Sequence, residues 1–143
     1  MPFKPTLGLA GKRFATLALA LGLCLPAWAQ KVKLATSLGD IVIELDSAKA
    51  PKSADNFLQY VKAGHYDGTV FHRVIDNFMI QGGGMTADGK MKPTRESIPL
   101  ESRNGLNNVR GSVAMARTSD PASAKAQFFI SVKDNAFLDA ANS

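Results

Sequence analysis

The chain has 143 residues, a single cysteine and a formal net charge of +5. This length is enough for one small domain, and a lone cysteine excludes an internal disulfide framework. The charge gives little support for a nucleic-acid partner, because Lys4, Lys12 and Arg13 lie in a leader with no acidic residue; without them the net charge falls to about +2.

Residues 1–29 have the pattern of a secretory signal peptide. Basic residues precede an apolar run over residues 14–25, and Ala27-Trp28-Ala29 gives an A-x-A cleavage pattern. The run is shorter than the roughly 20 residues that span a bilayer, so an uncleaved anchor is the weaker alternative. A lipoprotein is weaker still, because bulky Leu23 precedes Cys24. We expect cleavage after Ala29, a thiol-free domain over residues 30–143 without stable membrane association, and a periplasmic or secreted product.

Strands and one helix are predicted in the first half of this domain. Val32–Thr36 and Asp40–Leu45 read as two strands joined by a tight turn, the second with the alternation of a half-buried strand. A helix then begins near Pro51, has apolar residues at positions 54, 57, 58 and 61, and ends near Gly64.

Short strands dominate the remainder. Four strand-like runs are separated by polar stretches over residues 82–95 and 117–126, and no repeat or coiled coil is present. This order favours an antiparallel β-barrel or sandwich with a helical cap. The four runs are Val70–Ile75, Phe78–Gln81, Ser112–Ala116 and Gln127–Val132.

The segment FHRVIDNFMIQGG at residues 71–83 is highly specific, and it resembles the signature of the cyclophilin family. The resemblance extends from about Val32 to Asp139. It is also carried by APKSADNF at residues 50–57, GSVAMA at 111–116, AQFFI at 126–130 and FLD at 137–139.

The resemblance implies a mostly β fold, an antiparallel eight-stranded β-barrel capped by helices. The family domain is longer than this chain, so we expect the barrel here to be incomplete, with the last strands, the second helix and the pocket histidine missing and the sequence a fragment or truncation. The implied activity is peptidyl-prolyl cis-trans isomerisation on proline-containing polypeptides. No cofactor or metal is implied, and the family default is a monomer.

The resemblance also implies the site residues. Arg73 is the catalytic residue that donates to the imide nitrogen when the peptide bond is twisted, and Gln81 orients both Arg73 and the substrate. The other implied residues form the proline pocket and a ridge that holds the flanking backbone. They are Phe78, Met79, Phe129, Phe137 and Leu138 for the pocket, and Ala116, Arg117 and Gln127 for the ridge.

Without the ordered motifs, the same residues have ordinary structural interpretations. A lone Arg73 in a strand is usually a salt-bridged surface residue, and His72 is better read as a hydrogen-bonded structural histidine than as a base. On a strand, Phe128 points opposite to Phe129 and is expected in the core. The glycine run at residues 82–84 lacks the Lys-Ser/Thr and helix of a phosphate-binding loop.

Three positions depart from the commonest family pattern. Asp76-Asn77 replaces the usual Pro-Gly in a turn, at little risk because both residues tolerate turn geometry. Arg117 stands where many members carry Asn, which changes contacts to the substrate backbone. Phe137 replaces the Trp of many eukaryotic members, which implies weak cyclosporin binding with proline binding retained.

Two other functions compete with isomerisation. One is a non-catalytic proline-binding chaperone, against which Arg73 argues because simple binding has little use for it. The other is a structural β domain of the cell envelope, which no feature of the sequence supports.

Overall fold

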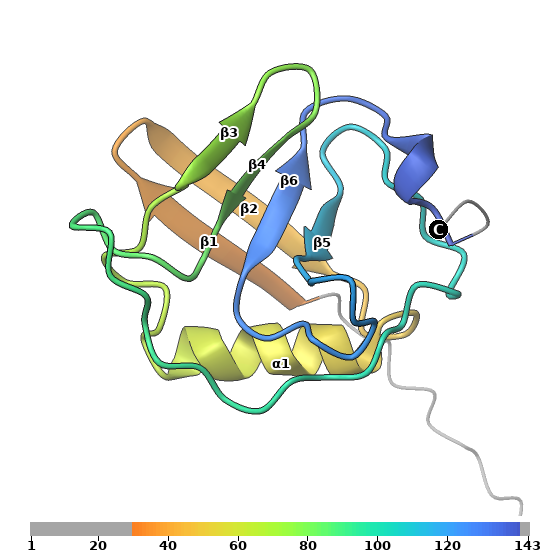
Figure 1. Cartoon of the computed structure of the whole chain (residues 1–143), viewed down its shortest axis with the longest axis horizontal. Helices are drawn as coiled ribbons and strands as arrows, with labels where there is room; N and C mark the ends of the chain where they lie inside the picture. Colours follow the sequence, from red (N-terminus) through yellow and green to blue (C-terminus); the bar gives the residue numbers. More distant parts are fainter. Residues whose placement is uncertain (1–29, 141–143) are drawn as a thin grey trace, which may run out of the picture.

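The computed structural model describes residues 30–140, so the predicted signal peptide lies outside the described residues. The chain order is two strands, a helix, four short strands and a 3-10 turn (Figure 1). None of the helices in this part of the chain is long and apolar enough to cross a membrane. The elements are β1 Gln30–Thr36, β2 Gly39–Leu45, α1 Pro51–Lys62, β3 Arg73–Ile75, β4 Met79–Gly82, β5 Val113–Met115, β6 Phe128–Ser131 and η1 Ala136–Leu138.

The strands form two separate antiparallel sheets. β1 pairs with β2 alone, and the second sheet has the order β3-β4-β6-β5. Figure 1 shows the β1–β2 pair behind the four-stranded sheet, with α1 along one end of both. Within residues 30–140 the two sheets do not join into a closed barrel.

The core lies where the two sheets and α1 meet. Val32 and Ile43 face each other across the β1–β2 register and pack with Phe57 of α1 and Phe128 of β6. The rings of Phe57 and Phe128 meet edge to face at 5.5 Å, a favourable aromatic geometry. Phe128 is 2% exposed, which confirms its prediction as a core residue.

Helix α1 receives its N-terminal cap from a distant loop. Ala50 precedes the helix and has no capping side chain, and the carboxylate of Glu101 instead accepts from the N–H groups of Lys52 at 3.0 Å and Ser53 at 2.7 Å. Burial raises the pKa of Glu101, but these bonds and the charge of Lys52 together hold the pKa below its ordinary value. The helix ends as predicted beside Gly64, whose φ of +66° is left-handed.

One strand is shorter than predicted. Of the run Val70–Ile75, only Arg73–Ile75 pairs with β4. The N–H of Val70 instead donates to the carbonyl of Met85, so this part of the run leaves the ladder. His72 is expected to be a hydrogen-bonded structural histidine. Its Nδ1 atom is buried but has no hydrogen-bond partner within residues 30–140.

Candidate functional site

The register of the four-stranded sheet brings distant side chains into one row. Arg73 of β3 is opposite Gln81 of β4, Gln81 is opposite Phe129 of β6, and Phe129 is opposite Ala114 of β5. Met79, two positions before Gln81, belongs to the same face because strand side chains alternate. Phe128 and its neighbours on the other face pack into the core, so this row lies on the opposite side of the sheet.

A chain of side-chain hydrogen bonds fixes the polar part of the row. Nη1 of Arg73 donates to Oε1 of Gln81 at 3.2 Å, and Nε2 of Gln81 donates to Oε1 of Gln127 at 2.9 Å. Arg73 is exposed and forms no ion pair with any residue from 30 to 140. Among residues 30–140, only one of the five guanidinium N–H donors has an acceptor, so the group retains both its charge and its capacity to bind a ligand.

A cavity of about 950 Å³ opens beside this row, and most of the predicted site residues line it. Its wall also includes core residues such as Ile43 and Phe57, so the cavity continues from the row past β5 toward α1. The predicted residues on the wall are Arg73, Phe78, Met79, Gln81, Ala116, Arg117, Phe129 and Leu138.

Two predicted residues lie beside the cavity instead of on its wall. Gln127 reaches the site through its hydrogen bond to Gln81. Phe137, on η1, is 59% exposed and packs against the ring of Phe78, with the centroids 5.5 Å apart. Phe137 therefore supports the wall residue Phe78 and is not part of the wall itself.

The guanidinium of Arg117 has a local partner. Its Nη1 donates to the carbonyl of Thr118 at 3.0 Å, and both residues are exposed. The hydroxyl of Ser123 accepts from the N–H of Thr118 at 2.9 Å and closes the turn that follows. Arg117 thus lies at the rim of the cavity on a loop with its own hydrogen bonds.

Asn135 is a supporting residue that the sequence reasoning missed. Its side chain is fully buried, and Nδ2 donates to the carbonyl of Phe78 at 3.0 Å. The same carbonyl accepts from the N–H of Val132 at 3.0 Å. The wall residue Phe78 is thereby tied to the segment that leads into η1. No sequence signal marked Asn135, because an asparagine that follows Lys133 and Asp134 reads as an ordinary turn residue.

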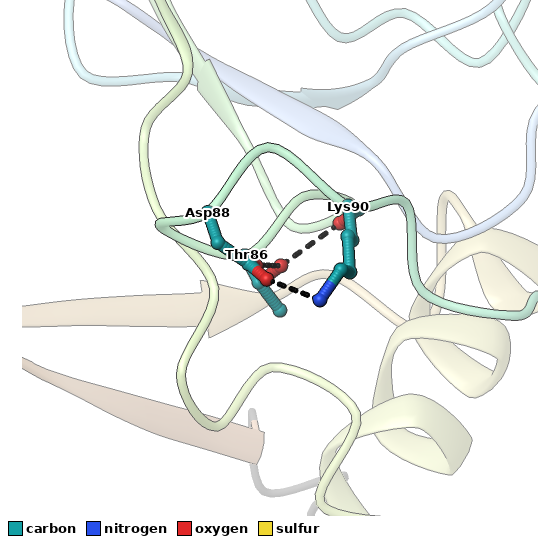
Figure 2. A network of polar contacts seen from close by, with 3 residues as sticks. All are labelled: Thr86, Asp88 and Lys90. Carbon is teal, nitrogen blue, oxygen red and sulfur yellow. Dashed lines mark hydrogen bonds and ion pairs between the residues drawn. The ribbon is translucent and has the colours of Figure 1, made fainter.

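The loop after β4 closes on itself through a small polar network. The hydroxyl of Thr86 bonds to Asp88, and the Asp88 carboxylate forms an ion pair of 2.7 Å with Lys90 (Figure 2). The hydrogen bonds from Lys90 and Thr86 lower the pKa of Asp88. This network holds the turn at residues 86–90, within the polar stretch predicted over residues 82–95.

No metal site is evident in the part of the chain that the structure describes. Residues 30–140 contain no cluster of three His, Cys, Asp or Glu side chains placed to hold an ion. The row beside the cavity presents the guanidinium of Arg73 and the linked amides of Gln81 and Gln127, and the cavity wall combines apolar side chains with polar ones that include Glu44, Asp46 and Glu101.

Comparisons with known proteins show which family this chain matches. The family model for cyclophilin type peptidyl-prolyl cis-trans isomerase/CLD matches residues 31–143. The peptidyl-prolyl cis-trans isomerase cyp18 of Streptomyces antibioticus is 63% identical over 108 residues, and peptidyl-prolyl cis-trans isomerase B of Escherichia coli strain K12 is 56% identical over 104 residues. These matches cover 76% and 73% of this chain, and 65% and 63% of the relatives. The chain thus spans slightly less than two thirds of the length of these curated relatives.

Solved structures give the same fold. A cyclophilin type peptidyl-prolyl cis-trans isomerase from Cryptosporidium parvum, crystallised in the presence of the dipeptide Ala-Pro, superposes with a TM-score of 0.66 at 31% identity. The match covers 77% of this chain and 72% of that one. The cyclophilin AquaCyp293 from Hirschia baltica gives a TM-score of 0.68 at 27% identity, covering 76% and 59% of the two chains. The predicted fold class is confirmed.

Proposed function

Since the chain belongs to the cyclophilin family of peptidyl-prolyl cis-trans isomerases, we propose that it accelerates rotation about X–Pro bonds in polypeptides. The observation that carries the proposal is the guanidinium of Arg73, which has no ion pair within residues 30–140 and is oriented by Gln81 at the wall of a largely apolar cavity. A salt-bridged surface arginine would have its charge neutralised by a carboxylate. Arg73 keeps its charge available beside the cavity.

The chemical step requires a charged hydrogen-bond donor such as the guanidinium of Arg73. Resonance in the peptide bond sets a barrier of roughly 18–20 kcal/mol, and both isomers of an X–Pro bond are populated. In the twisted transition state the imide nitrogen becomes pyramidal and carries a lone pair. A guanidinium that donates to this lone pair stabilises the twisted state more than either planar state, which accelerates rotation without a covalent intermediate.

The surroundings of Arg73 supply the binding that this mechanism requires. Phe78, Met79, Phe129 and Leu138 line the cavity and offer an apolar seat for the proline ring. We assign the backbone on either side of the proline to the polar edge formed by Gln81 and Gln127 and to the rim at Ala116 and Arg117. A relative in the family was crystallised with Ala-Pro, a ligand of the expected chemical class.

The test is the exchange rate between cis and trans forms of an X–Pro peptide, measured by NMR in the presence of the full chain. Arg73→Ala is expected to reduce the catalysed rate by about 10²–10³, the range for removal of one transition-state donor. Arg73→Lys keeps the charge and loses the planar fork, so it separates the need for charge from the need for orientation. If Arg73→Ala left the exchange rate unchanged while the peptide still bound, the chain would be a proline-binding chaperone without isomerase activity.

Two finer properties belong to the same proposal. We propose a monomer, as is usual in the family, and weak cyclosporin binding, because Phe137 stands where many eukaryotic members carry Trp. Binding of cyclosporin titrated by fluorescence against Phe137→Trp tests the second point, and tighter binding by the variant is expected. Equal binding by the two proteins would contradict it.

We also propose that the protein works on exported polypeptides in the periplasm or outside the cell. The support is the leader pattern over residues 1–29, with its apolar run and Ala27-Trp28-Ala29. Slow X–Pro isomerisation limits the folding of many chains, so such a location would supply substrates. Fractionation followed by N-terminal sequencing tests the proposal, with Gln30 expected as the first residue.

A further inference from the structure

Gly84 lies directly against the side chain of Gln127. A Cβ atom at position 84 would lie 2.5 Å from Cγ, 2.8 Å from Cδ and 2.6 Å from Nε2 of Gln127. Real Cβ atoms essentially never approach other heavy atoms so closely. Any side chain at position 84 would therefore compete with Gln127 for the same space.

The requirement for glycine at this position concerns space and not backbone conformation. Gly83 has a φ of +85°, where a side chain is strained whatever its surroundings. Gly84 is not among the residues with positive φ, so alanine fits its backbone conformation. Gly84→Ala therefore tests the contact with Gln127 without straining the backbone.

The backbone at Gly84 is held in place by its neighbours. The carbonyl of Gly83 lies 3.1 Å from Nε2 of the buried His65, and the carbonyl of Gly84 accepts from the N–H of Lys92 at 2.9 Å. The loop that follows is closed by the Thr86 network of Figure 2. The backbone cannot move away from Gln127 without breaking these hydrogen bonds.

The backbone of Gln127 is held as firmly. Its carbonyl accepts from the N–H of Ala116 at 2.9 Å, and it stands between Ala126 and Phe128, which are 0% and 2% exposed. A clash with Cγ is relieved only by rotation about the first side-chain torsion, because that torsion sets the position of Cγ. Such a rotation carries the amide of Gln127 away from Gln81.

We infer that Gly84 is a positioning residue for the catalytic arginine. By leaving room for Gln127, it allows Oε1 of Gln127 to accept from Gln81, whose own Oε1 then faces Nη1 of Arg73. The inference rests on the proposed isomerase function for its effect on rate. The geometric part, that Gly84 sets the orientation of Gln127 and Gln81, stands apart from the activity.

A double-mutant cycle between Gly84→Ala and Gln127→Ala tests the inference in the full chain. Gly84→Ala alone is expected to lower kcat/KM for an X–Pro peptide by about three- to ten-fold, the loss of roughly one hydrogen bond, with most of the effect in kcat. In the Gln127→Ala background the added methyl meets no amide, so Gly84→Ala is expected to have no further effect. Equal effects of Gly84→Ala in both backgrounds would overturn the inference.

NMR of the side-chain amides gives a readout that does not depend on activity. The amide signals of Gln81 and the guanidinium signal of Arg73 should shift in Gly84→Ala and stay in place in Ala87→Ser, a substitution at an exposed position of the following loop. Unshifted signals in Gly84→Ala would overturn the positioning claim. Shifted signals in a protein with no isomerase activity would uphold the geometry and reject the proposed function.

Discussion

The side-chain Nδ2 of Asn135 donates to the carbonyl oxygen of Phe78 across 57 positions of the chain, at a distance of 3.0 Å. Because Asn135 is 0% exposed, this bond is shielded from water and joins the wall of the cavity to the segment that carries η1. The backbone N–H of Asn135 donates to the carbonyl of Asn108 at 2.7 Å, which brings a third segment to the same point.

Asn135→Ala should therefore destabilise the fold and loosen the cavity wall. We expect the free energy of unfolding to fall by about 1–3 kcal/mol, because a buried hydrogen bond is lost and its acceptor loses a partner. The KM for an X–Pro peptide should rise, since the position of Phe78 is less well fixed. Urea unfolding and initial rates measure the two effects. Asn107→Ala, at an exposed amide, is the stability control, and equal stability of the two variants would contradict the prediction.

Gln81→Leu should lower the rate while leaving the fold intact. The substitution conserves most of the side-chain volume and removes both the acceptor for Arg73 and the donor to Gln127. We expect kcat/KM to fall about ten-fold, consistent with the loss of one exposed and one half-buried hydrogen bond. Exchange NMR on an X–Pro peptide measures the rate and thermal unfolding the stability. A rate equal to that of the unsubstituted chain would show that Arg73 needs no orienting partner.

Glu101→Gln should weaken the start of α1. The amide has only one oxygen, so it cannot replace the acceptors for both Lys52 and Ser53, and a loss of about 1 kcal/mol is expected from known helix caps. The folded pKa of Glu101 is below its ordinary value of 4.5, so its stabilisation is complete above 4.5 and is lost as the pH falls through the folded pKa.

Unfolding free energies between about pH 7 and pH 3 measure this dependence. The decrease in unfolding free energy on acidification should be smaller in Glu101→Gln than in the unsubstituted chain. Glu96→Gln is the matched control, because Glu96 is exposed and forms no ion pair or side-chain hydrogen bond with any residue from 30 to 140. If the unfolding free energy of Glu96→Gln also fell less on acidification than that of the unsubstituted chain, the effect would not be specific to the helix cap.

His65 should make the fold less stable in mild acid. Burial lowers its pKa from 6.5, the bond to the Gly83 carbonyl opposes this shift, and the charge of Lys92 adds to it. The unfolded chain therefore takes up a proton at a higher pH than the folded chain. Stability is complete above 6.5 and falls as the pH drops from there toward the folded pKa.

Melting temperatures between about pH 8 and pH 5 test this prediction. His65→Gln retains a donor for the carbonyl of Gly83 and cannot titrate, so its melting temperature should vary less over this range. An identical pH profile in the two proteins would exclude His65 as the source of the dependence.

Local patterns predicted the elements well where one face of the chain packs against the core. The alternation at Phe128 and Phe129 assigns one ring to the core and the other to the site, and the structure agrees because the period of a strand is fixed by its geometry. The strand predicted from Val70 begins only at Arg73, because the N–H of Val70 donates outside the ladder, to the carbonyl of Met85. Composition cannot reveal which partner a backbone N–H will find.

The site residues came from resemblance to a family, and their supporting contacts did not. Gln127 reaches the cavity only through Gln81, and Phe137 supports Phe78 from outside the wall. In the sequence Gly84 is one member of a glycine run, and its contact with Gln127 exists only after the sheet has formed. Spacing along the chain carries no information about such contacts.

The attachments of α1 have a consequence for the order in which the protein folds during synthesis. The helix is held by Glu101 at its first turn, by the carbonyl of Lys125 on Asn56, and by the N–H of Arg95 on Tyr60, and each partner follows its contact by 35 to 69 positions. A ribosome that has just released Lys62 has made none of these partners. Nascent α1 can pack Phe57 against Val32 and Ile43, which are made before it, but the hydrogen bonds that fix its polar positions form only after Arg95, Glu101 and Lys125 have been translated.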